Sequence, residues 1–315
     1  MKVLFIDTVH EILQQRLEKK GVECIDGSKF SLEECRSELQ KGIDGIVIRS
    51  RFRMDVTLLE GAEDLKFIAR SGAGMENIDE AYCQQRNIQL FNAPEGNRTA
   101  VGEHALGMLL SLFNHLKKGD TEVRKGIWDR EGNRGIELTG KTVGIIGYGN
   151  NGSAFAKVLR GFDCRILAYD KYRTGFGDEF VEESSLEEIY KQAEIISFHI
   201  PQNGETIHWA NPAFFEQINH PFYLINLSRG KIVQTSALMD AIASGKVKGA
   251  VLDVLEYESS SFENVFSGQL PPDFQRLLES EQVLLSPHVG GWTNESYYKL
   301  SSVLADKIEA AYFTY

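Results

Sequence analysis

Short apolar runs alternate with amphipathic polar stretches along the first 94 residues of the chain. The apolar runs are rich in β-branched and aromatic residues and predict four strands, KVLFID (2–7), GIVIR (45–49), LKFIAR (65–70) and IQLFN (88–92). The stretches between them have helical spacing, most clearly HEILQQRLEKKG (10–21), SLEECRSELQKG (31–42) and IDEAYCQQRN (78–87). Strands that alternate with helices are typical of a parallel sheet, so this part of the chain predicts an α/β domain of its own.

A second alternating series begins near residue 142. Its predicted strands are TVGIIG (142–147), CRILAYD (164–170), EIISFHI (194–200), FYLINLS (222–228), GAVLDVL (249–255) and VLLSP (283–287). The chain closes with a predicted helix, NESYYKLSSVLADKIEAAYF (294–313). We therefore expect an α/β protein with two domains built on parallel sheets, Rossmann-like and flavodoxin-like.

Two connecting segments have a different character. The segment NRTAVGEHALGMLLSLFNHLKKGDTEVRKG (97–126) is apolar on a helical period and contains no proline, which predicts one long helix leading out of the first domain. The segment SSSFENVFSGQLPPDF (259–274) is the most loop-like part of the chain.

Composition narrows the class of protein. The 315 residues, 42% hydrophobic and 25% charged, suit one large or two ordinary soluble domains. No apolar run is long enough to span a membrane, and Asp7 interrupts what would be the apolar core of a signal peptide. The four cysteines form no C-x-x-C pair, which argues against a zinc site or disulfide framework and fits a cytoplasmic location. A net charge of −11 argues against nucleic acid as a partner, so an anionic substrate would need a local positive pocket.

The hexapeptide GYGNNG (147–152) fits the pattern G-x-G-x-x-G, and its surroundings give that pattern meaning. It follows a predicted strand directly, opens a helix-like stretch, and is followed by Asp170 at the end of the next strand, 18 residues beyond Gly152. This is the layout of a dinucleotide site. Gly147 permits the tight turn, Gly149 lets the backbone approach the pyrophosphate, and Gly152 lets the helix pack against the sheet.

The residues after the second strand bear on which dinucleotide binds. Asp170 can accept hydrogen bonds from both ribose hydroxyls and would repel a 2′-phosphate, which favours NAD over NADP. Lys171 and Arg173 lie beside it and weaken that preference. The alternative for the whole pattern is a strand–helix turn that binds nothing.

Candidate catalytic residues follow three later strands. Arg229 comes just after FYLINLS, Glu256 and Glu258 come after GAVLDVL, and His288 comes after VLLSP. Ligands of open α/β sheets bind outside the carboxyl ends of the strands, so these side chains should converge near the nicotinamide. Arginine can hold a carboxylate with two hydrogen bonds. Histidine can give a proton to a developing alkoxide, and a neighbouring glutamate would orient its ring.

Together these residue types describe the reduction of a 2-keto acid by hydride transfer. Each residue taken alone has a plainer interpretation: His288 could cap a helix or pack in the core, and Arg229 could be a surface residue. Their shared position at strand ends is what favours the catalytic interpretation.

Six motifs give the chain a resemblance to a known family over nearly its full length. They are RSGAGMENID (70–79), NAPEGNRTAVGEHALGM (92–108), LTGKTVGIIGYGNNG (138–152), INLSRGKIV (225–233), GAVLDVLEYE (249–258) and SPHVGGWT (286–293). In this order they resemble the D-isomer-specific 2-hydroxyacid dehydrogenases. The resemblance implies a catalytic trio of Arg229, Glu258 and His288. Glu258 is preferred to Glu256 because the family's glutamate lies five residues after the aspartate that matches Asp253.

The resemblance also implies the binding residues. Backbone N–H groups around Ala73 and Gly74 would hold the substrate carboxylate, and Asp253 would face the nicotinamide carboxamide. The implied NAD site comprises Gly147, Gly149, Asn150, Asn151, Gly152, Asp170, Pro201, Thr206, Leu227, Asp253 and Gly290. We expect no metal, because the remaining histidines have no ligand-like spacing.

The family's architecture implies how the chain is divided. A discontinuous substrate domain (1–97 and 291–315) would be interrupted by an inserted NAD-binding Rossmann domain (98–290), with catalysis in the cleft and a homodimer formed through the cofactor domain. The chain stops at Tyr315 after the closing helix, so feedback through an appended regulatory domain is not expected.

One departure from the family concerns the catalytic loop. Ser259 follows Glu258 where the family usually has proline, and the segment between Glu258 and His288 is longer than expected.

Three arginines narrow the expected substrate. Arg49, Arg70 and Arg130 match positions that surround the substrate phosphate in the D-3-phosphoglycerate dehydrogenases, the subgroup that this chain most resembles. A cluster of guanidinium groups suits a dianion, and this activity would serve serine biosynthesis. The alternatives are scattered surface arginines and a hydroxypyruvate or glyoxylate reductase. A protein of another class, an NAD-binding corepressor that docks peptides, shares the fold but is not favoured here.

Overall fold

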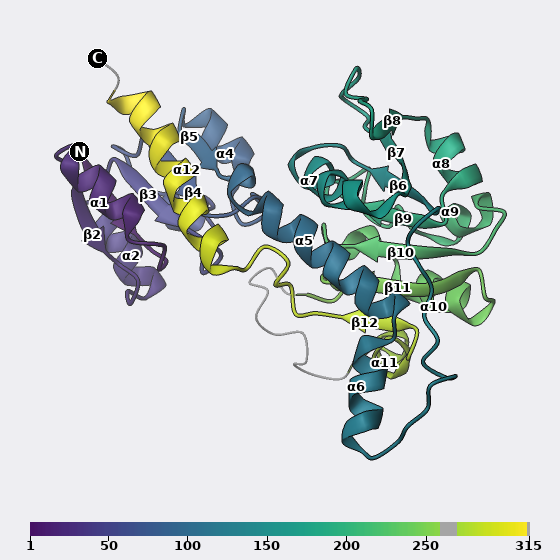
Figure 1. Ribbon diagram of the computed structural model, residues 1–315. Coiled ribbons are helices and arrows are strands. Elements are labelled where there is room, and N and C mark those ends of the chain that lie inside the picture. The colour runs from purple at the N-terminus through teal and green to yellow at the C-terminus, as the bar shows by residue number, and fades with distance from the viewer. Residues whose placement is uncertain (259–269, 314–315) are drawn as a thin grey trace. The chain divides into compact units, whose positions relative to one another are not determined.

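The computed structural model describes residues 1–258 and 270–313, which form two compact units (Figure 1). The first unit combines Met1–Arg98 with the segment that begins at Trp292, and the second combines Thr99–Glu258 with the segment that ends at Gly291. Each unit is built around its own parallel sheet. The predicted α/β class with two parallel sheets is confirmed.

The first unit is a five-stranded sheet in the order β2-β1-β3-β4-β5, the flavodoxin-like arrangement. Its elements are β1 (Lys2–Phe5), α1 (Ile12–Lys19), β2 (Glu23–Asp26), α2 (Leu32–Leu39), β3 (Gly45–Ile48), α3 (Val56–Leu59), β4 (Phe67–Arg70), α4 (Glu80–Gln85), β5 (Gln89–Asn92) and α12 (Asn294–Tyr312). The sequence patterns predicted this series except for β2 and α3, whose few residues are too short for a clear period.

The C-terminal helix α12 packs beside α1 in this unit, as Figure 1 shows. Leu304 and Ile308 are fully buried in the same apolar cluster as Leu17. At the rim of this contact the Arg16 guanidinium donates two hydrogen bonds of 2.8 Å to the Glu309 carboxylate. A buried apolar stripe with a bidentate ion pair at its edge therefore explains why the last helix joins the N-terminal sheet.

The second unit is a seven-stranded sheet in the order β12-β11-β10-β9-β6-β7-β8. Its elements are α6 (Leu116–Arg124), β6 (Thr142–Ile146), α7 (Asn150–Leu159), η1 (Arg160–Phe162), β7 (Arg165–Tyr169), β8 (Val181–Glu183), α8 (Leu186–Gln192), β9 (Ile195–Phe198), α9 (Pro212–Gln217), β10 (Phe222–Asn226), η2 (Gly230–Ile232), α10 (Thr235–Ala243), β11 (Val247–Leu252), α11 (Pro272–Glu279) and β12 (Val283–Leu285). Helix α5 (Pro94–Phe113) begins in the first unit and continues into the second. From β6 the chain adds β7 and β8 on one side of the sheet, and then returns to add β9 on the other side of β6. The strand order therefore reverses beside β6, as in dinucleotide-binding sheets.

The single long helix predicted for residues 97–126 is wrong. The structure has two helices there, α5 ending at Phe113 and α6 beginning at Leu116. His115 lies between them in the left-handed conformation (φ 49°), which ends a right-handed helix. The Phe113 carbonyl accepts a hydrogen bond from the Ile136 N–H instead of continuing the helix. Neither proline nor glycine marks this break, so the local sequence carries no signal for it.

The predicted loop at 259–274 is also partly wrong. Residues 259–269, including Ser259, lie outside the described residues, but Pro272 already begins α11. Proline is well suited to the first turn of a helix, and Phe274 and Leu277 then bury their side chains. Within the described ranges, every helix is too short or too polar to cross a bilayer.

Candidate active site and cofactor site

The loop between β6 and α7 has the shape that a pyrophosphate requires. Gly147 has φ +95°, and a Cβ there would lie 2.7 Å from the His199 carbonyl oxygen. A Cβ at Gly152 would lie 2.0 Å from the Gly147 carbonyl oxygen, so the helix can approach the strand only without a side chain. In contrast, a Cβ at Gly149 would meet nothing within 4 Å. The loop is therefore tight on two sides and open at its middle glycine, which fits a bound dinucleotide.

The start of α7 supports the same fit. Gly149 is the N-cap residue and provides no side-chain hydrogen bond to the first turn, so the helix offers its backbone N–H groups to a ligand. Asn150 and Asn151 form that first turn and are half-buried. The Asn151 Oδ1 atom is buried and has no hydrogen-bond partner within residues 1–258 and 270–313. These residues would hold the NAD phosphates if the cofactor binds as the sequence predicts.

Asp170 lies at the end of β7 and is tied to the glycine loop. Its Oδ2 atom accepts a hydrogen bond of 2.8 Å from the Tyr148 N–H, inside the fingerprint. Its Oδ1 atom accepts from the N–H groups of Tyr172 (2.9 Å) and Arg173 (3.1 Å). A carboxylate oxygen has two lone pairs, so Oδ2 retains capacity for a ribose hydroxyl while it positions the loop.

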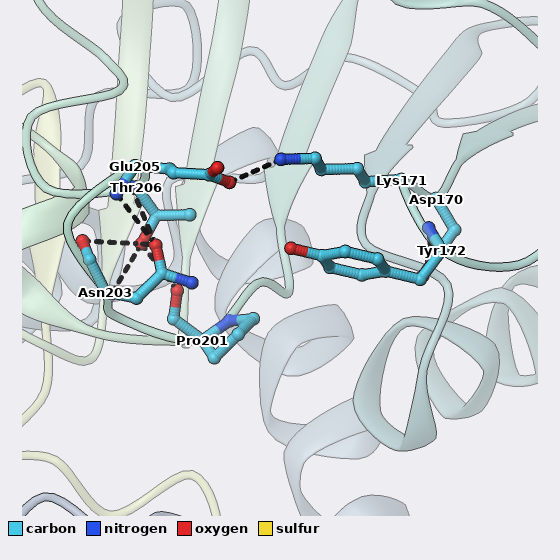
Figure 2. Close-up of polar contacts among 7 residues, drawn as sticks. All are labelled: Asp170, Lys171, Tyr172, Pro201, Asn203, Glu205 and Thr206. Carbon is cyan, nitrogen blue, oxygen red and sulfur yellow. Dashed lines mark hydrogen bonds and ion pairs between the residues drawn. The ribbon is translucent and has the colours of Figure 1, made fainter.

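The loop after β9 faces Asp170 across the end of β6, as Figure 2 shows. The Thr206 hydroxyl donates to the Pro201 carbonyl (2.7 Å) and accepts from the Asn203 N–H (2.8 Å). Thr206, predicted as a cofactor-binding residue, is thus buried and closes the loop itself. Its direct contact with NAD stays a prediction. Leu227 and Gly290 lie close together, because a Cβ at Gly290 would lie 3.3 Å from Leu227 Cδ2.

Two of the three predicted catalytic side chains are in contact. The His288 Nδ1 atom lies 2.7 Å from Glu258 Oε2, and both residues follow the carboxyl ends of neighbouring strands, β12 and β11. The other carboxylate oxygen of Glu258 accepts a hydrogen bond from the Leu255 N–H (2.5 Å). His288 has φ 54°, an unusual conformation for a residue with a Cβ. The ring is therefore held by a carboxylate and by a constrained backbone.

Asp253 organises the segment that carries His288. Its side chain is buried, and it accepts hydrogen bonds from the Ser286 hydroxyl (2.6 Å) and from the N–H groups of Val289 (2.9 Å) and Gly290 (2.7 Å). Burial alone would raise the pKa of the Asp253 carboxyl, but these bonds and one from His104 outweigh it, so the pKa is lowered. The predicted contact with the nicotinamide stays a prediction, while the bonds seen here fix the loop around His288.

Arg229 sits in a turn after β10 that a buried asparagine shapes. The Asn226 side chain donates to the Arg229 carbonyl (2.9 Å) and accepts from the Ser228 hydroxyl (2.7 Å). The Arg229 Nη1 atom donates to the Ser228 carbonyl (2.7 Å). A Cβ at the next residue, Gly230, would lie 1.9 Å from the Leu255 carbonyl oxygen. The turn that carries Arg229 therefore lies directly against the segment that leads to Glu258.

Glu256, the alternative to Glu258, has different partners. Its Oε1 atom lies 2.7 Å from His208 Nε2, and its Oε2 atom accepts a hydrogen bond from the Thr235 N–H (2.7 Å) at the start of α10. The contact with His288 belongs to Glu258. The two glutamates thus point to separate histidines although they are only two residues apart.

In the first unit, two of the three predicted phosphate-binding arginines meet. Arg49 follows β3, and Arg70 is the last residue of the neighbouring strand β4. Arg70 Nε donates to the Arg49 carbonyl (3.1 Å) and to Asn77 Oδ1 (3.1 Å). Asn77 is buried and donates to the same Arg49 carbonyl (3.2 Å). The Arg49 guanidinium lies over the Trp292 ring, 4.0 Å from its centroid.

The remaining predicted substrate residues fall in both units. Ala73 and Gly74 follow β4, and within the described ranges nothing accepts a hydrogen bond from either N–H group. Two adjacent N–H groups of this kind can bind an anion. Arg130 belongs to the second unit and is exposed. The expected cluster of three arginines therefore stays a prediction.

Several residues were not predicted. Asn77, Trp292 and Asn226 lie inside quoted motifs, but a single sequence does not separate them from their neighbours. A further unpredicted contact involves His104, whose Nε2 atom lies 3.0 Å from Ser286 Oγ and 3.5 Å from Asp253 Oδ1. His104 lies in α5, far along the chain from Ser286 and Asp253, so the sequence gave no indication that these residues are close.

Comparison with known proteins gives a family match over most of the second unit. The model of the D-isomer specific 2-hydroxyacid dehydrogenase NAD binding domain matches residues 106–290. A D-3-phosphoglycerate dehydrogenase of Archaeoglobus fulgidus is 33% identical over 98% of this chain and 56% of its own length. The chain thus spans about half of that relative. A hydroxypyruvate reductase of Thermotoga maritima is 32% identical over 84% of both chains.

Solved structures agree in fold. The D-lactate dehydrogenase of Aquifex aeolicus, determined with NAD and lactic acid, superposes with a TM-score of 0.82 at 27% identity. The match covers 99% of this chain and 95% of that one. The similarity therefore extends over both units and includes a relative whose structure holds NAD.

Proposed function

Because this chain belongs to the D-isomer specific 2-hydroxyacid dehydrogenase family and contains its NAD-binding domain, we propose that it interconverts a D-2-hydroxy acid and the 2-keto acid. The observation that carries the proposal is the 2.7 Å contact between His288 Nδ1 and Glu258 Oε2, in a unit whose glycine loop is shaped for pyrophosphate. NAD supplies the hydride chemistry, and the protein must bind the acid and move one proton.

Each catalytic side chain has a defined part in this proposal. Glu258 fixes the His288 ring through Nδ1, so we assign the proton exchanged with the substrate oxygen to Nε2. Arg229 binds the substrate carboxylate or carbonyl with its planar guanidinium. The N–H groups of Ala73 and Gly74 complete carboxylate binding. Asp253 holds the His288 segment in place through its bonds to Val289 and Gly290.

For the substrate, we propose 3-phosphoglycerate and 3-phosphohydroxypyruvate. The position of Arg49 and Arg70 at adjacent strand ends, with Arg70 Nε bonded to the Arg49 carbonyl, and the phosphoglycerate dehydrogenase relative support this choice. Arg130 is assigned to the same phosphate. The competing candidate is hydroxypyruvate or glyoxylate reduction, which the similar reductase of comparable length supports.

A panel of keto acids followed by NADH absorbance tests the proposal. We expect phosphohydroxypyruvate to have the highest kcat/KM, and Arg49→Gln to raise KM for it more than for hydroxypyruvate. Arg53→Gln is the matched control, because Arg53 is an exposed arginine of the same segment paired only loosely with Asp55 (3.6 Å). A clear preference for glyoxylate or unphosphorylated hydroxypyruvate would reject the phosphate assignment. Absence of turnover on every acid would reject the enzymatic proposal.

We also propose that the protein is a homodimer formed through the second unit. No residue of α6 is buried, although Leu116 is 57% exposed and Val123 is 54% exposed. Trp128, just after this helix, is 79% exposed. A helix that exposes its apolar residues is expected to bury them against a second copy. Light scattering should give twice the chain mass, and Val123→Glu should reduce it to one chain.

Location is part of the same proposal. The four cysteines form no disulfide, which supports a reducing, cytoplasmic environment.

A further inference from the structure

An ion pair crosses the end of the strand that carries the glycine fingerprint. Lys171, the second residue after β7, has its Nζ atom 2.5 Å from Glu205 Oε2 in the loop after β9 (Figure 2). Strands β7 and β9 flank β6 on either side, so the pair connects the two loops that border the predicted adenosine site. Tyr172 lies beneath it, with Lys171 Nζ 5.5 Å from the ring centroid.

The position of Lys171 matters for the choice of dinucleotide. In dinucleotide-binding sheets, an acidic residue after the second strand receives the ribose hydroxyls, and a cation near it accommodates a 2′-phosphate. This chain has the acidic residue, Asp170, and also two cations, Lys171 and Arg173. Arg173 Nη1 donates to the Tyr148 carbonyl (2.5 Å), which directs it to the glycine loop. Lys171 is directed to Glu205.

We propose that Glu205 is a specificity-determining residue that disfavours NADP by holding Lys171, the cation that follows Asp170, in an ion pair. The inference rests on the proposed cofactor site and deepens it. A 2′-phosphate beside Asp170 would have to draw Lys171 away from Glu205, because Arg173 is already directed to the Tyr148 carbonyl. NAD, which lacks that phosphate, does not meet this penalty.

The surroundings of Glu205 favour a role in recognition over one in folding. Its side chain is 63% exposed, and exposed ion pairs contribute little to stability. The loop is closed without its carboxylate, because the Glu205 N–H donates to Asn203 Oδ1 (2.9 Å) and Thr206 bonds to Pro201. The hydrogen bond from Lys171 to Glu205 raises the pKa of Lys171, so the lysine is a cation at neutral pH.

Cofactor titrations on the purified full chain test the inference without any keto acid. Dissociation constants for NADH and NADPH are measured by nucleotide fluorescence for the wild type and for Glu205→Gln. We expect the NADH constant to change little and the NADPH constant to fall, shifting their ratio roughly two- to fivefold toward NADPH. The shift should shrink at high salt, because the groups are exposed. Glu216→Gln, an exposed carboxylate on α9, controls for the change in net charge.

The double variant Lys171→Met with Glu205→Gln identifies the cause. The gain in NADPH binding should disappear in it, since Lys171, the cation that Glu205→Gln releases, is then absent. An unchanged NADPH to NADH ratio in Glu205→Gln, or a gain that survives in the double variant, would overturn the inference. These results are distinct from failure of the proposed function, which would appear as a wild type that binds neither nucleotide.

Discussion

The Glu256 carboxylate lies 2.7 Å from the His208 ring, on a segment whose next carboxylate, two residues later, holds His288. Glu256 also receives the Thr235 N–H at the start of α10. One short segment therefore joins the loop after β9, the start of a helix and the proposed catalytic histidine. We infer that Glu256 positions Glu258 and does not itself touch substrate.

Replacing Glu256 tests this positioning role. Glu256→Ala should lower kcat about tenfold and affect KM for the keto acid less, because Glu258 would be less firmly aimed at His288. Loss of this half-buried acceptor should also cost about 1–2 kcal/mol of unfolding free energy. Glu256→Gln should recover much of kcat, since an amide oxygen can still accept from Thr235. Steady-state kinetics and urea unfolding of both variants check this, and an unchanged kcat in Glu256→Ala would refute it.

The proposed proton transfer makes a separate prediction for His288. His288→Ala should lower kcat by roughly 10²–10⁴, the usual contribution of a general acid or base, while NADH still binds. Steady-state assays measure the loss of kcat, and NADH fluorescence titration measures cofactor binding independently. His115→Asn is the control, because His115 is exposed and asparagine tolerates its left-handed backbone. Near-normal turnover of the alanine variant would remove His288 from the mechanism.

The sequence allowed the architecture and the main contact to be predicted for physical reasons. Parallel strands buried on both faces appear as apolar runs, and residues after them must meet at one edge, which is why a glutamate after β11 could be paired with His288. The choice of Glu258 over Glu256 came from the family resemblance. The break at His115 could not be predicted, because the Phe113 carbonyl there accepts a hydrogen bond from Ile136, 23 residues further along the chain. The roles of Asn77 and His104 depend likewise on partners distant in the chain.

The fingerprint glycines should respond differently to the same substitution. Gly149→Ala places its Cβ in open space at φ −86°, so unfolding free energy should change by no more than about 0.5 kcal/mol. Its NADH affinity should fall roughly tenfold or more, because the methyl group occupies the approach to the pyrophosphate. Gly152→Ala forces a Cβ to 2.0 Å from the Gly147 carbonyl and should cost about 1–3 kcal/mol.

Urea unfolding and NADH titration of both glycine variants separate the two effects. Wild-type NADH affinity in Gly149→Ala would show that the loop does not hold the pyrophosphate. Wild-type stability in Gly152→Ala would contradict the close packing of α7 against β6.

The lowered pKa of Asp253 predicts how stability depends on pH. Its folded pKa lies below the unfolded value of about 3.9, so the carboxylate contributes stability that is fully present above that value. The contribution is lost as pH falls from about 5 through the folded pKa, because the unfolded chain then binds the proton more readily. Asp253→Asn removes this contribution. The carboxylate accepts from Ser286 with one oxygen and from Gly290 with the other, whereas an amide has only one oxygen that can accept.

Thermal or urea unfolding between pH 3.5 and 8 measures this contribution. We expect Asp253→Asn to be less stable than the wild type by roughly 2–4 kcal/mol at neutral pH, with the difference shrinking below about pH 5. Asp163→Asn is the control, because Asp163 is exposed and already has the left-handed backbone that asparagine accepts. That variant should follow the wild-type pH dependence. If the difference in unfolding free energy between Asp253→Asn and the wild type stayed constant down to pH 3.5, the Asp253 carboxylate would not be held charged by its hydrogen bonds.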